Sequence, residues 1–425
     1  MKSDNTSGNE KDLTGGITQK SQFHQKLLCD YGLIECEQTP ITDKLKEENI
    51  VIKLSSYDIV ENGILSKGHV SYLITTYPLK YEVHRRYSDF ECLSHYFSSK
   101  YINTVIPPLP KKNYRDRLND DFIKKRMRKL EKFLNSIITN SLLFYDPIFL
   151  DFINLEEKDW IKKQTYYYKQ YETPCELKKI YSLDGRIHYN IPDNEKEFSN
   201  IKDHLESNGR LINTLLSLYK NLFEHMNEMV LQINAITEVW KQLKEISKIS
   251  KDNKLEKIYK TWANSSYKLS KTFEAQNLIY NNEIKEFFKY YKNELKGLID
   301  LTYKCNDFQN RYYKEYNQLL DKKKYSFNKL LKLGFNQQTE NGFNEQQKIV
   351  SEIMFPDETK NTLCLKQWYG MYLKAVISEY DRLKQVHLKE HTKMMGSVGS
   401  KNMKLFNEFQ ICYADFVMIA NQYKS

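Results

Sequence analysis

The chain has 425 residues, which is enough for two or three domains that each form their own core. Aromatic residues make up 13% of it, including 32 Tyr and 21 Phe, so we expect most of the chain to fold. No apolar run approaches the roughly 18 residues that cross a membrane, and the N-terminus lacks an apolar signal-peptide core, so we expect a soluble, cytoplasmic protein. The formal net charge of +10 favours a polyanionic partner, either nucleic acid or an acidic membrane surface.

The first part of the chain predicts a tail followed by one mixed domain. Residues 1–47 are rich in Ser, Gly, Asn, Lys and Thr, and we expect a disordered tail. Residues 48–156 are expected to form an α+β domain. Its three β-rich runs, IVIKLSSYDIV, HVSYLITT and KYEVHRRY, are separated by turn residues and predict an antiparallel sheet. The segment DDFIKKRMRKLEKFLNSIITN then has apolar residues at helical spacing.

A polar linker, residues 157–192, leads to an all-α region, residues 193–425. Glycine is sparse in that region and its only proline is Pro356, so long helices are possible. Apolar residues recur every three or four positions in three stretches, and this spacing predicts three long helices. The stretches are residues 211–243, 255–319 and 368–423. We expect an irregular connection at 334–347 and a break of the third helix at the glycines of MMGSVGSKN.

Three long helices in one chain expose apolar stripes that the chain itself does not easily cover. A helix of about 50 to 60 residues is roughly 75 to 90 Å long, far longer than a compact bundle requires. We therefore predict an elongated dimer. The alternative is a monomeric helical repeat, although no repeat of about 34 or 40 residues is visible.

No motif points clearly to catalysis or to a bound cofactor. The seven cysteines are scattered and never stand in CxxC spacing, which argues against a zinc ribbon or a disulfide framework. The stretch HLKEH, residues 387–391, has the formal spacing of an inverted zinc-protease motif. Only 34 residues follow it, within a helical pattern, so we interpret it as a polar helix face. We predict a protein that is not an enzyme and holds neither cofactor nor metal.

Two arginines and a tyrosine end the third β-rich run, in the stretch RRYSDF. Arginine carries a permanent charge and a rigid fork of donors that matches phosphate, and an aromatic ring can lie beneath a sugar-like ring. Arg85, Arg86 and Tyr87 therefore suit a phosphorylated polyol, although a solvated strand end is the alternative. Lys112, at the end of the proline-stiffened IPPLPKK, and Arg126, in the cation-rich helix, add two more cations.

RRYSDF, IPPLPKK and FIKKRMRKLEKFL, in this order, resemble the phox-homology (PX) domain of sorting nexins over residues 48–156. The resemblance implies that the domain binds phosphatidylinositol 3-phosphate. It implies that Arg86 binds the 3-phosphate, that Tyr87 stacks beneath the inositol ring and that Ser88 adds a contact near the same phosphate. Arg85 is then structural or a general electrostatic contact.

The same resemblance assigns the other two cations and a membrane loop. Lys112 would meet the 1-phosphate, and Arg126 would bind the ring hydroxyls at positions 4 and 5. The loop 107–119, with Leu109 and Tyr114, would enter the bilayer beside the headgroup.

The helical region resembles the BAR domain of PX-BAR sorting nexins, a crescent-shaped antiparallel dimer that senses or imposes membrane curvature. The N-terminal tail and HVSYLITT are most similar to the sorting nexin 4 type of the family, also called autophagy-related protein 24. Lys322, Lys323 and Lys324 would lie at the tip of the crescent, where clustered lysines gain from an anionic bilayer.

The family resemblance also implies partners and a location. It implies membranes that carry phosphatidylinositol 3-phosphate, at endosomes and the preautophagosomal structure, with the chain as a homodimer or as a heterodimer with a related sorting nexin. Retrieval of cargo such as SNAREs from endosomes to the Golgi, selective autophagy and the absence of a nucleic-acid partner are further expectations.

Two other functions stay open on the sequence. A basic coiled-coil protein that binds nucleic acid would depend on salt but not on the lipid headgroup. A scaffold tethered by its PX domain would localise through Arg86 and show no preference for curvature.

Overall fold

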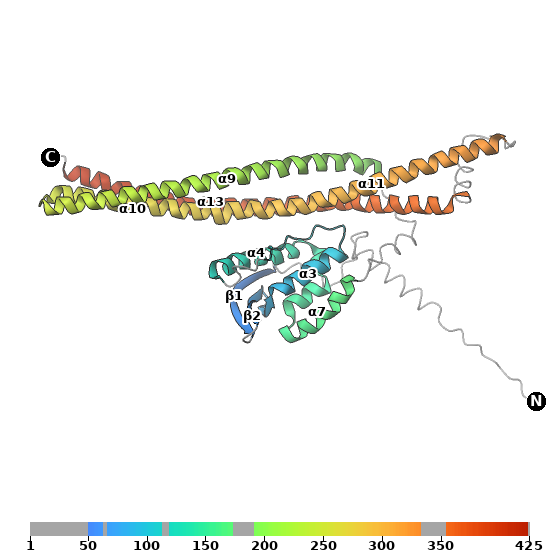
Figure 1. Ribbon diagram of the computed structural model, residues 1–425, viewed down its shortest axis with the longest axis horizontal. Coiled ribbons are helices and arrows are strands. Elements are labelled where there is room, and N and C mark those ends of the chain that lie inside the picture. Colours follow the sequence, from blue (N-terminus) through green and yellow to red (C-terminus); the bar gives the residue numbers. More distant parts are fainter. Residues whose placement is uncertain (1–49, 63–65, 113–118, 173–190, 333–353, 424–425) are drawn as a thin grey trace, which may run out of the picture. The chain divides into compact units, whose positions relative to one another are not determined.

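The computed structural model describes residues 50–62, 66–112, 119–172, 191–332 and 354–423. They belong to two compact units. The first unit draws on residues 1–199 and 300–379, and the second on residues 200–299 and 380–425. The sheet and the short helices belong to the first unit, whereas three long helical segments contribute to both (Figure 1).

Three antiparallel strands form the sheet, in the order β1-β2-β3. The strands are β1 Val51–Asn62, β2 Ser66–Tyr77 and β3 Tyr81–Arg86. Val51 of β1 lies opposite Tyr77 of β2, and Thr76 of β2 lies opposite Tyr81 of β3. The antiparallel sheet that the β-rich runs predicted is therefore confirmed.

Among the described residues, five helices follow the sheet before the long helices begin. They are α3 Tyr87–Lys100, α4 Asp120–Ile138, α5 Ser141–Phe144, α6 Pro147–Asn154 and α7 Glu157–Glu172. The helix predicted in DDFIKKRMRKLEKFLNSIITN is α4, and Asn119 caps it by accepting a hydrogen bond from the backbone N–H of Phe122. The sequence analysis did not predict α3, which begins directly after β3 and buries Phe90 and Leu93 in the core.

One hydrophobic core joins the sheet to these helices, and it reaches into α7. Trp160 and Tyr167 of α7 are buried in it, and the Trp160 ring lies 5.3 Å from that of Phe152, edge to face. The sequence analysis ended the domain at residue 156 and assigned these positions to a linker. In the structure, residues 157–172 are a helix of the domain because three of its side chains, Trp160, Gln164 and Tyr167, are buried at helical spacing.

The rest of the described chain consists of long helices. They are α9 Ile191–Ile249, then α10 Asn253–Ile279, a π-helical turn Tyr280–Lys285 and α11 Glu286–Lys332, and finally α13 Pro356–Gln422. The three predicted helical stretches are thus confirmed. The expected break in the third is wrong, because α13 runs unbroken through Gly396 and Gly399. Each glycine costs a helix only about 1 kcal/mol, which contacts along a helix of 67 residues offset. The connection 334–347 lies outside the described residues.

Polar and aromatic contacts join the long helices within each unit. In the first unit, Glu195 of α9 accepts a hydrogen bond of 2.6 Å from the hydroxyl of Tyr369 in α13. In the second unit, the ring of Trp262 in α10 lies 5.2 Å from that of Trp240 in α9 and 4.4 Å from that of Phe416 in α13. These contacts join α9 to α13 in the first unit and α9, α10 and α13 in the second.

Candidate functional site

Arg85 and Arg86 end β3, and their side chains have opposite environments. Arg85 is 1% exposed, whereas 48% of the Arg86 side chain is exposed. Successive side chains of a strand point to opposite faces, so the pair divides into one core cation and one surface cation.

Arg85 is a structural residue that closes the end of α6. Its Nε–H donates to the carbonyl of Phe152 over 3.0 Å, and its Nη2 donates to the carbonyl of Leu155 over 2.5 Å. Its guanidinium also lies over the ring of Trp160, 5.1 Å from the centroid. A cation is favourable beside the carbonyl end of a helix. Burial lowers the pKa of Arg85 to about 10, although the negative charge of Asp89 acts in the opposite direction.

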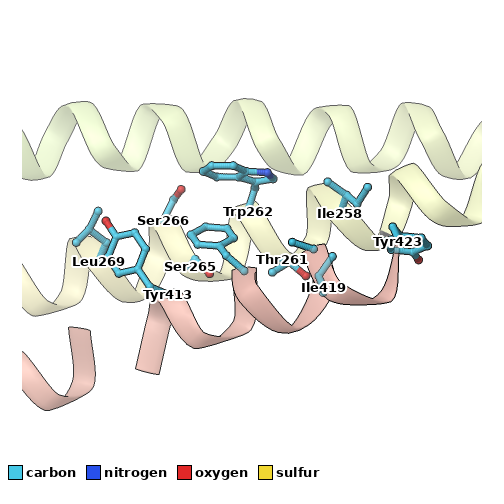
Figure 2. A pocket seen from close by; sticks show the side chains of 11 residues that line it. Ile258, Thr261, Trp262, Ser265, Ser266, Leu269, Tyr413, Ile419 and Tyr423 are labelled. Atoms are coloured by element: carbon cyan, nitrogen blue, oxygen red, sulfur yellow. The ribbon is translucent and has the colours of Figure 1, made fainter. Parts of the chain in front are cut away.

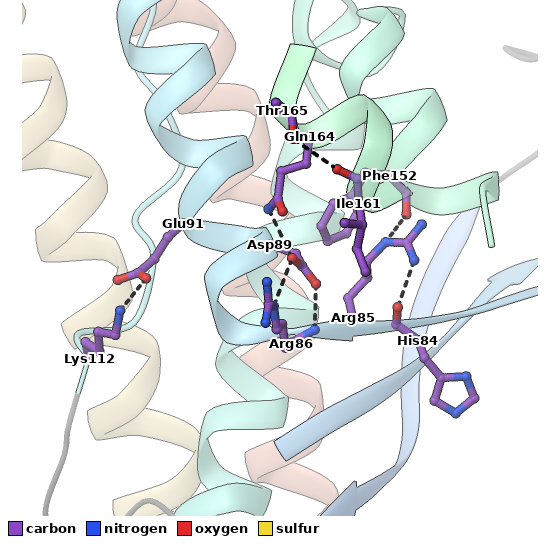
Figure 3. Close-up of polar contacts among 10 residues, drawn as sticks. All are labelled: His84, Arg85, Arg86, Asp89, Glu91, Lys112, Phe152, Ile161, Gln164 and Thr165. Atoms are coloured by element: carbon purple, nitrogen blue, oxygen red, sulfur yellow. Dashed lines mark hydrogen bonds and ion pairs between the residues drawn. The ribbon is translucent and has the colours of Figure 1, made fainter. Parts of the chain in front are cut away.

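Arg86 stands immediately before α3, where the first backbone N–H groups of the helix favour an anion. A buried carboxylate supports it from below. Asp89 is 4% exposed, accepts the backbone N–H of Arg86 over 2.8 Å and lies 3.6 Å from Arg86 Nε (Figure 3). The ion pair uses Nε, so the Nη donors of this half-exposed side chain can still bind a second anion.

The ring of Tyr87 is the meeting point of two further cations. The guanidinium of Arg126, from α4, lies 4.7 Å from the centroid of this ring, and Lys112 Nζ lies 5.8 Å from it. The Tyr87 hydroxyl donates to the carbonyl of Pro110 over 2.5 Å, which fixes the ring against the proline-rich segment. Cations at these distances from an aromatic face are attracted to it.

Arg126 is buried but keeps one donor unused. It is 7% exposed, and its Nη2 has no hydrogen-bond partner in the part of the chain that the structure describes. The hydroxyl of Tyr72, on β2, is likewise buried without a partner among those residues. Burial raises the pKa of Tyr72, and the positive charge of Arg126 opposes that change. The positive charge of Arg126 is therefore fixed beside the rings of Tyr72 and Tyr87.

Lys112 is held by a carboxylate of α3. Its Nζ lies 2.6 Å from Glu91 Oε2, and 42% of its side chain is exposed. An anionic ligand at Lys112 has to share this ammonium with Glu91, or to displace it. Ser88 follows Tyr87 in the first turn of α3 and is half-buried.

The structure brings the predicted site residues together. Arg86, Tyr87 and Ser88 are consecutive at the start of α3, and Lys112 and Arg126 converge on the Tyr87 ring. Two cations over one aromatic ring, with Arg86 adjacent to that tyrosine in the chain, suit a ring-shaped ligand that carries several anionic or hydroxyl oxygens.

The predicted membrane-contact residues have varied environments. Leu109 is half-buried and packs against the domain core, and its predicted contact with a membrane stays a prediction. Tyr114 lies outside the described residues. At the end of α11, Lys322 lies 2.9 Å from Glu358 Oε1, Lys323 is half-buried and Lys324 is exposed.

Three residues of the site were missed by the sequence analysis. Asp89 could have been found, because it stands three residues after Arg86, at the spacing of a helix cap. Glu91 and Gln164 carry no such local signal. Gln164 donates to Asp89 from α7, 75 positions further along the chain.

The HLKEH stretch is not the polar face that the sequence suggested. His387 is 7% exposed, and its Nε2 lies 2.9 Å from the carboxylate of Glu294 in α11. Among the residues that the structure describes, no group of three His, Cys, Asp or Glu side chains is arranged to hold a metal ion. Within the same residues, no helix is apolar and long enough to cross a bilayer.

Comparisons with known proteins show which family this region resembles. The PX domain family matches residues 77–156. Sorting nexin-4 of Pongo abelii is 30% identical over 172 residues, which cover 36% of this chain and 36% of that protein. Sorting nexin-4 of Candida albicans is 26% identical over 262 residues, covering 52% of this chain and 37% of that protein. The chain thus matches about a third of the length of each of these two relatives.

A solved structure extends the similarity to the helical region. The cryo-EM structure of the SNX-BAR Mvp1 tetramer aligns with a TM-score of 0.55 and 17% identity, over 88% of this chain and all of that one. The PX match and this fold support a sorting nexin of the PX-BAR class. Within that class, the sequence similarity relates the chain to the sorting nexin-4 proteins.

Proposed function

We propose that this chain is a peripheral membrane protein, not an enzyme, that binds phosphatidylinositol 3-phosphate through its PX domain. The observation that carries the proposal is the convergence of Lys112 and Arg126 on the Tyr87 ring, directly beside the half-exposed Arg86. Arginine forks and a helix N-terminus are both suited to phosphate.

Each residue has a role in this proposal. Arg86 binds the 3-phosphate with its Nη donors, together with the first N–H groups of α3, and Ser88 adds a hydroxyl in the same turn. Tyr87 lies beneath the inositol ring. Lys112 binds the 1-phosphate, and Arg126 binds ring hydroxyls.

We further propose that the BAR region forms a dimer through the apolar surface of α10 and α13 in the second unit. A cavity of about 560 Å³ lies between these helices and is lined mainly by apolar side chains (Figure 2). On α13, Met403, Phe406, Tyr413 and Val417 follow at helical spacing and are between 47% and 70% exposed. A monomer rarely exposes so continuous an apolar surface, and a second BAR chain, identical or related, would cover it.

A dimer would give the protein two headgroup sites on one body. Two weak contacts with the same membrane multiply in strength, so the dimer binds more tightly than either PX domain alone. Lys322, Lys323 and Lys324 add electrostatic attraction to an anionic bilayer, and the BAR dimer adds a preference for curved membranes.

We propose that these properties serve cargo retrieval from endosomes to the Golgi, with SNAREs as one cargo class, and selective autophagy. The corresponding locations are the endosome membrane and the preautophagosomal structure. Support for this role comes from the similarity to sorting nexin-4 proteins.

Co-sedimentation with vesicles tests the headgroup site. Wild type, Arg86→Ala and Arg128→Ala are compared on phosphatidylcholine vesicles with phosphatidylserine, with and without phosphatidylinositol 3-phosphate. Arg128 is exposed on α4, so its variant removes the same charge away from the site. We expect only Arg86→Ala to lose the part of the binding that requires phosphatidylinositol 3-phosphate.

Other results would select the rival functions. Equal binding to all anionic vesicles and to RNA or DNA, untouched by Arg86→Ala, would indicate a general basic surface. Binding that requires Arg86 but is equal on vesicles of about 30 and 200 nm would indicate a PX-tethered scaffold without a curvature preference.

A further inference from the structure

Helix α7 lies outside the residues that match the PX family, yet it contacts Arg85 and, through Asp89, is connected to Arg86 of the proposed headgroup site. The family match ends at residue 156, and α7 spans Glu157–Glu172. Its Trp160 stacks on Arg85, and its Gln164 donates a hydrogen bond to Asp89. Arg85 is therefore in direct contact with α7, and Arg86 is connected to α7 through the carboxylate of Asp89.

The geometry at Asp89 links Gln164 closely to Arg86. Asp89 Oδ1 accepts the hydrogen bond of 3.1 Å from Gln164 Nε2 and lies 3.6 Å from Arg86 Nε, and Oδ2 accepts the backbone N–H of Arg86 (Figure 3). Asp89 and Gln164 are 4% and 7% exposed, so water does not easily replace either partner. Loss of one donor to a buried carboxylate disturbs the contacts that remain.

The chemistry of an amide suits this position. Gln164 satisfies one oxygen of Asp89 without neutralising its charge, so the carboxylate can still attract Arg86. A lysine or arginine at 164 would compete with Arg86 for the carboxylate, and an apolar residue would leave an acceptor without a donor. Asp89 in turn engages Nε of Arg86, which leaves the Nη donors for phosphate.

We propose that Gln164 is a positioning residue for the phosphoinositide site, which fixes Asp89 and, through it, the guanidinium of Arg86. The docking of α7 on the PX domain then sets the affinity for the headgroup. Because Gln164 lies on α7 and donates to Asp89, a change that loosens α7 would reach the lipid site. This inference rests on the proposed function of Arg86.

The test uses the full-length chain and the two vesicle compositions above. Gln164→Leu keeps the size of the side chain and removes the donor, whereas Thr165→Ala changes the neighbouring, exposed position of the same helix. We expect Gln164→Leu to weaken the binding that requires phosphatidylinositol 3-phosphate by about 3- to 10-fold, as for the loss of one buried hydrogen bond. Thr165→Ala, and the binding of both variants to vesicles with phosphatidylserine alone, should match wild type.

A double-mutant cycle separates positioning from a general loss of structure. Arg86→Lys keeps the charge but has no Nε, so adding Gln164→Leu to it should cause little further loss. If Gln164→Leu does not fold, Gln164→Asn keeps the amide but shortens it by one methylene, and it should weaken binding in the same direction.

Two results would refute the role of Gln164, and a third would also refute the proposed headgroup site. Folded Gln164 variants that bind like wild type, while Arg86→Ala loses binding, refute the role of Gln164 alone. The role of Gln164 is also refuted if Gln164→Leu causes the same loss of binding in the wild-type and the Arg86→Lys backgrounds. If Arg86→Ala itself binds like wild type, the proposed headgroup site and this inference fall together.

Discussion

The PX domain and the second unit contain similar aromatic side chains and use them in different ways. In the PX domain, Phe90, Phe152 and Trp160 are fully buried in one core that also encloses Arg85. In the second unit, Phe406 and Val417 are 65% and 61% exposed on α13. A closed core can carry a binding site on a single chain. An open apolar face is instead the kind of surface that a second chain covers.

The strongest test of the closed core is Arg85→Ala. The change removes a buried cation and leaves the carbonyls of Phe152 and Leu155 without their donor. We expect it to lower the local stability of α6 and α7 by about 3 to 5 kcal/mol. Hydrogen–deuterium exchange of the full-length chain would show this as faster exchange in both helices.

Two variants control this prediction. Arg128→Ala removes an exposed arginine and should change the local stability reported by the same amides by less than about 0.5 kcal/mol. Arg85→Lys should rescue little, because one ammonium cannot reach both carbonyls and also stack on Trp160. Unchanged protection in Arg85→Ala would mean that the core does not depend on this cation.

The open face is tested by Phe406→Asp, with Asn407→Asp as its matched control. Both add one negative charge at exposed, adjacent positions of α13, but only the first lies on the apolar face. We expect Phe406→Asp to weaken dimerisation by about 10- to 100-fold, as for the loss of a buried interface aromatic. Light scattering after size exclusion measures this, and equal behaviour of the two variants would rule out this face as the interface.

A smaller effect is expected from Glu91→Gln, which acts on the surface of the closed domain. The variant releases Lys112 from an ion pair of 2.6 Å, so a phosphate no longer competes with a carboxylate. Because exposed ion pairs contribute about 0 to 1 kcal/mol, we expect the affinity for phosphatidylinositol 3-phosphate to rise by about 2- to 5-fold. Vesicle titration at two salt concentrations measures it, and weaker binding would mean that Glu91 orients Lys112.

The sequence predicted much of the site because its residues occur in short motifs. Arg86, Tyr87 and Ser88 are adjacent, and Lys112 follows prolines that restrict its position. Strand alternation also separates Arg85 from Arg86, although it cannot say which of them faces the core. The family resemblance implied that Lys112 and Arg126 contact one ligand, and the folded domain places both cations over the ring of Tyr87.

By itself the sequence determined the antiparallel sheet, helix α4, the long helices and the cations of the proposed headgroup site. These features follow from local periodicity and from residues close in the chain. Only the tertiary structure decided that α7 belongs to the PX domain and that Gln164 supports Asp89. The stretch WIKKQTYYYKQY contains one buried amide among lysines and tyrosines, and hydrophobic periodicity does not recognise a glutamine as a core residue. Its partner is 75 positions away, so the contact exists only once the domain has folded.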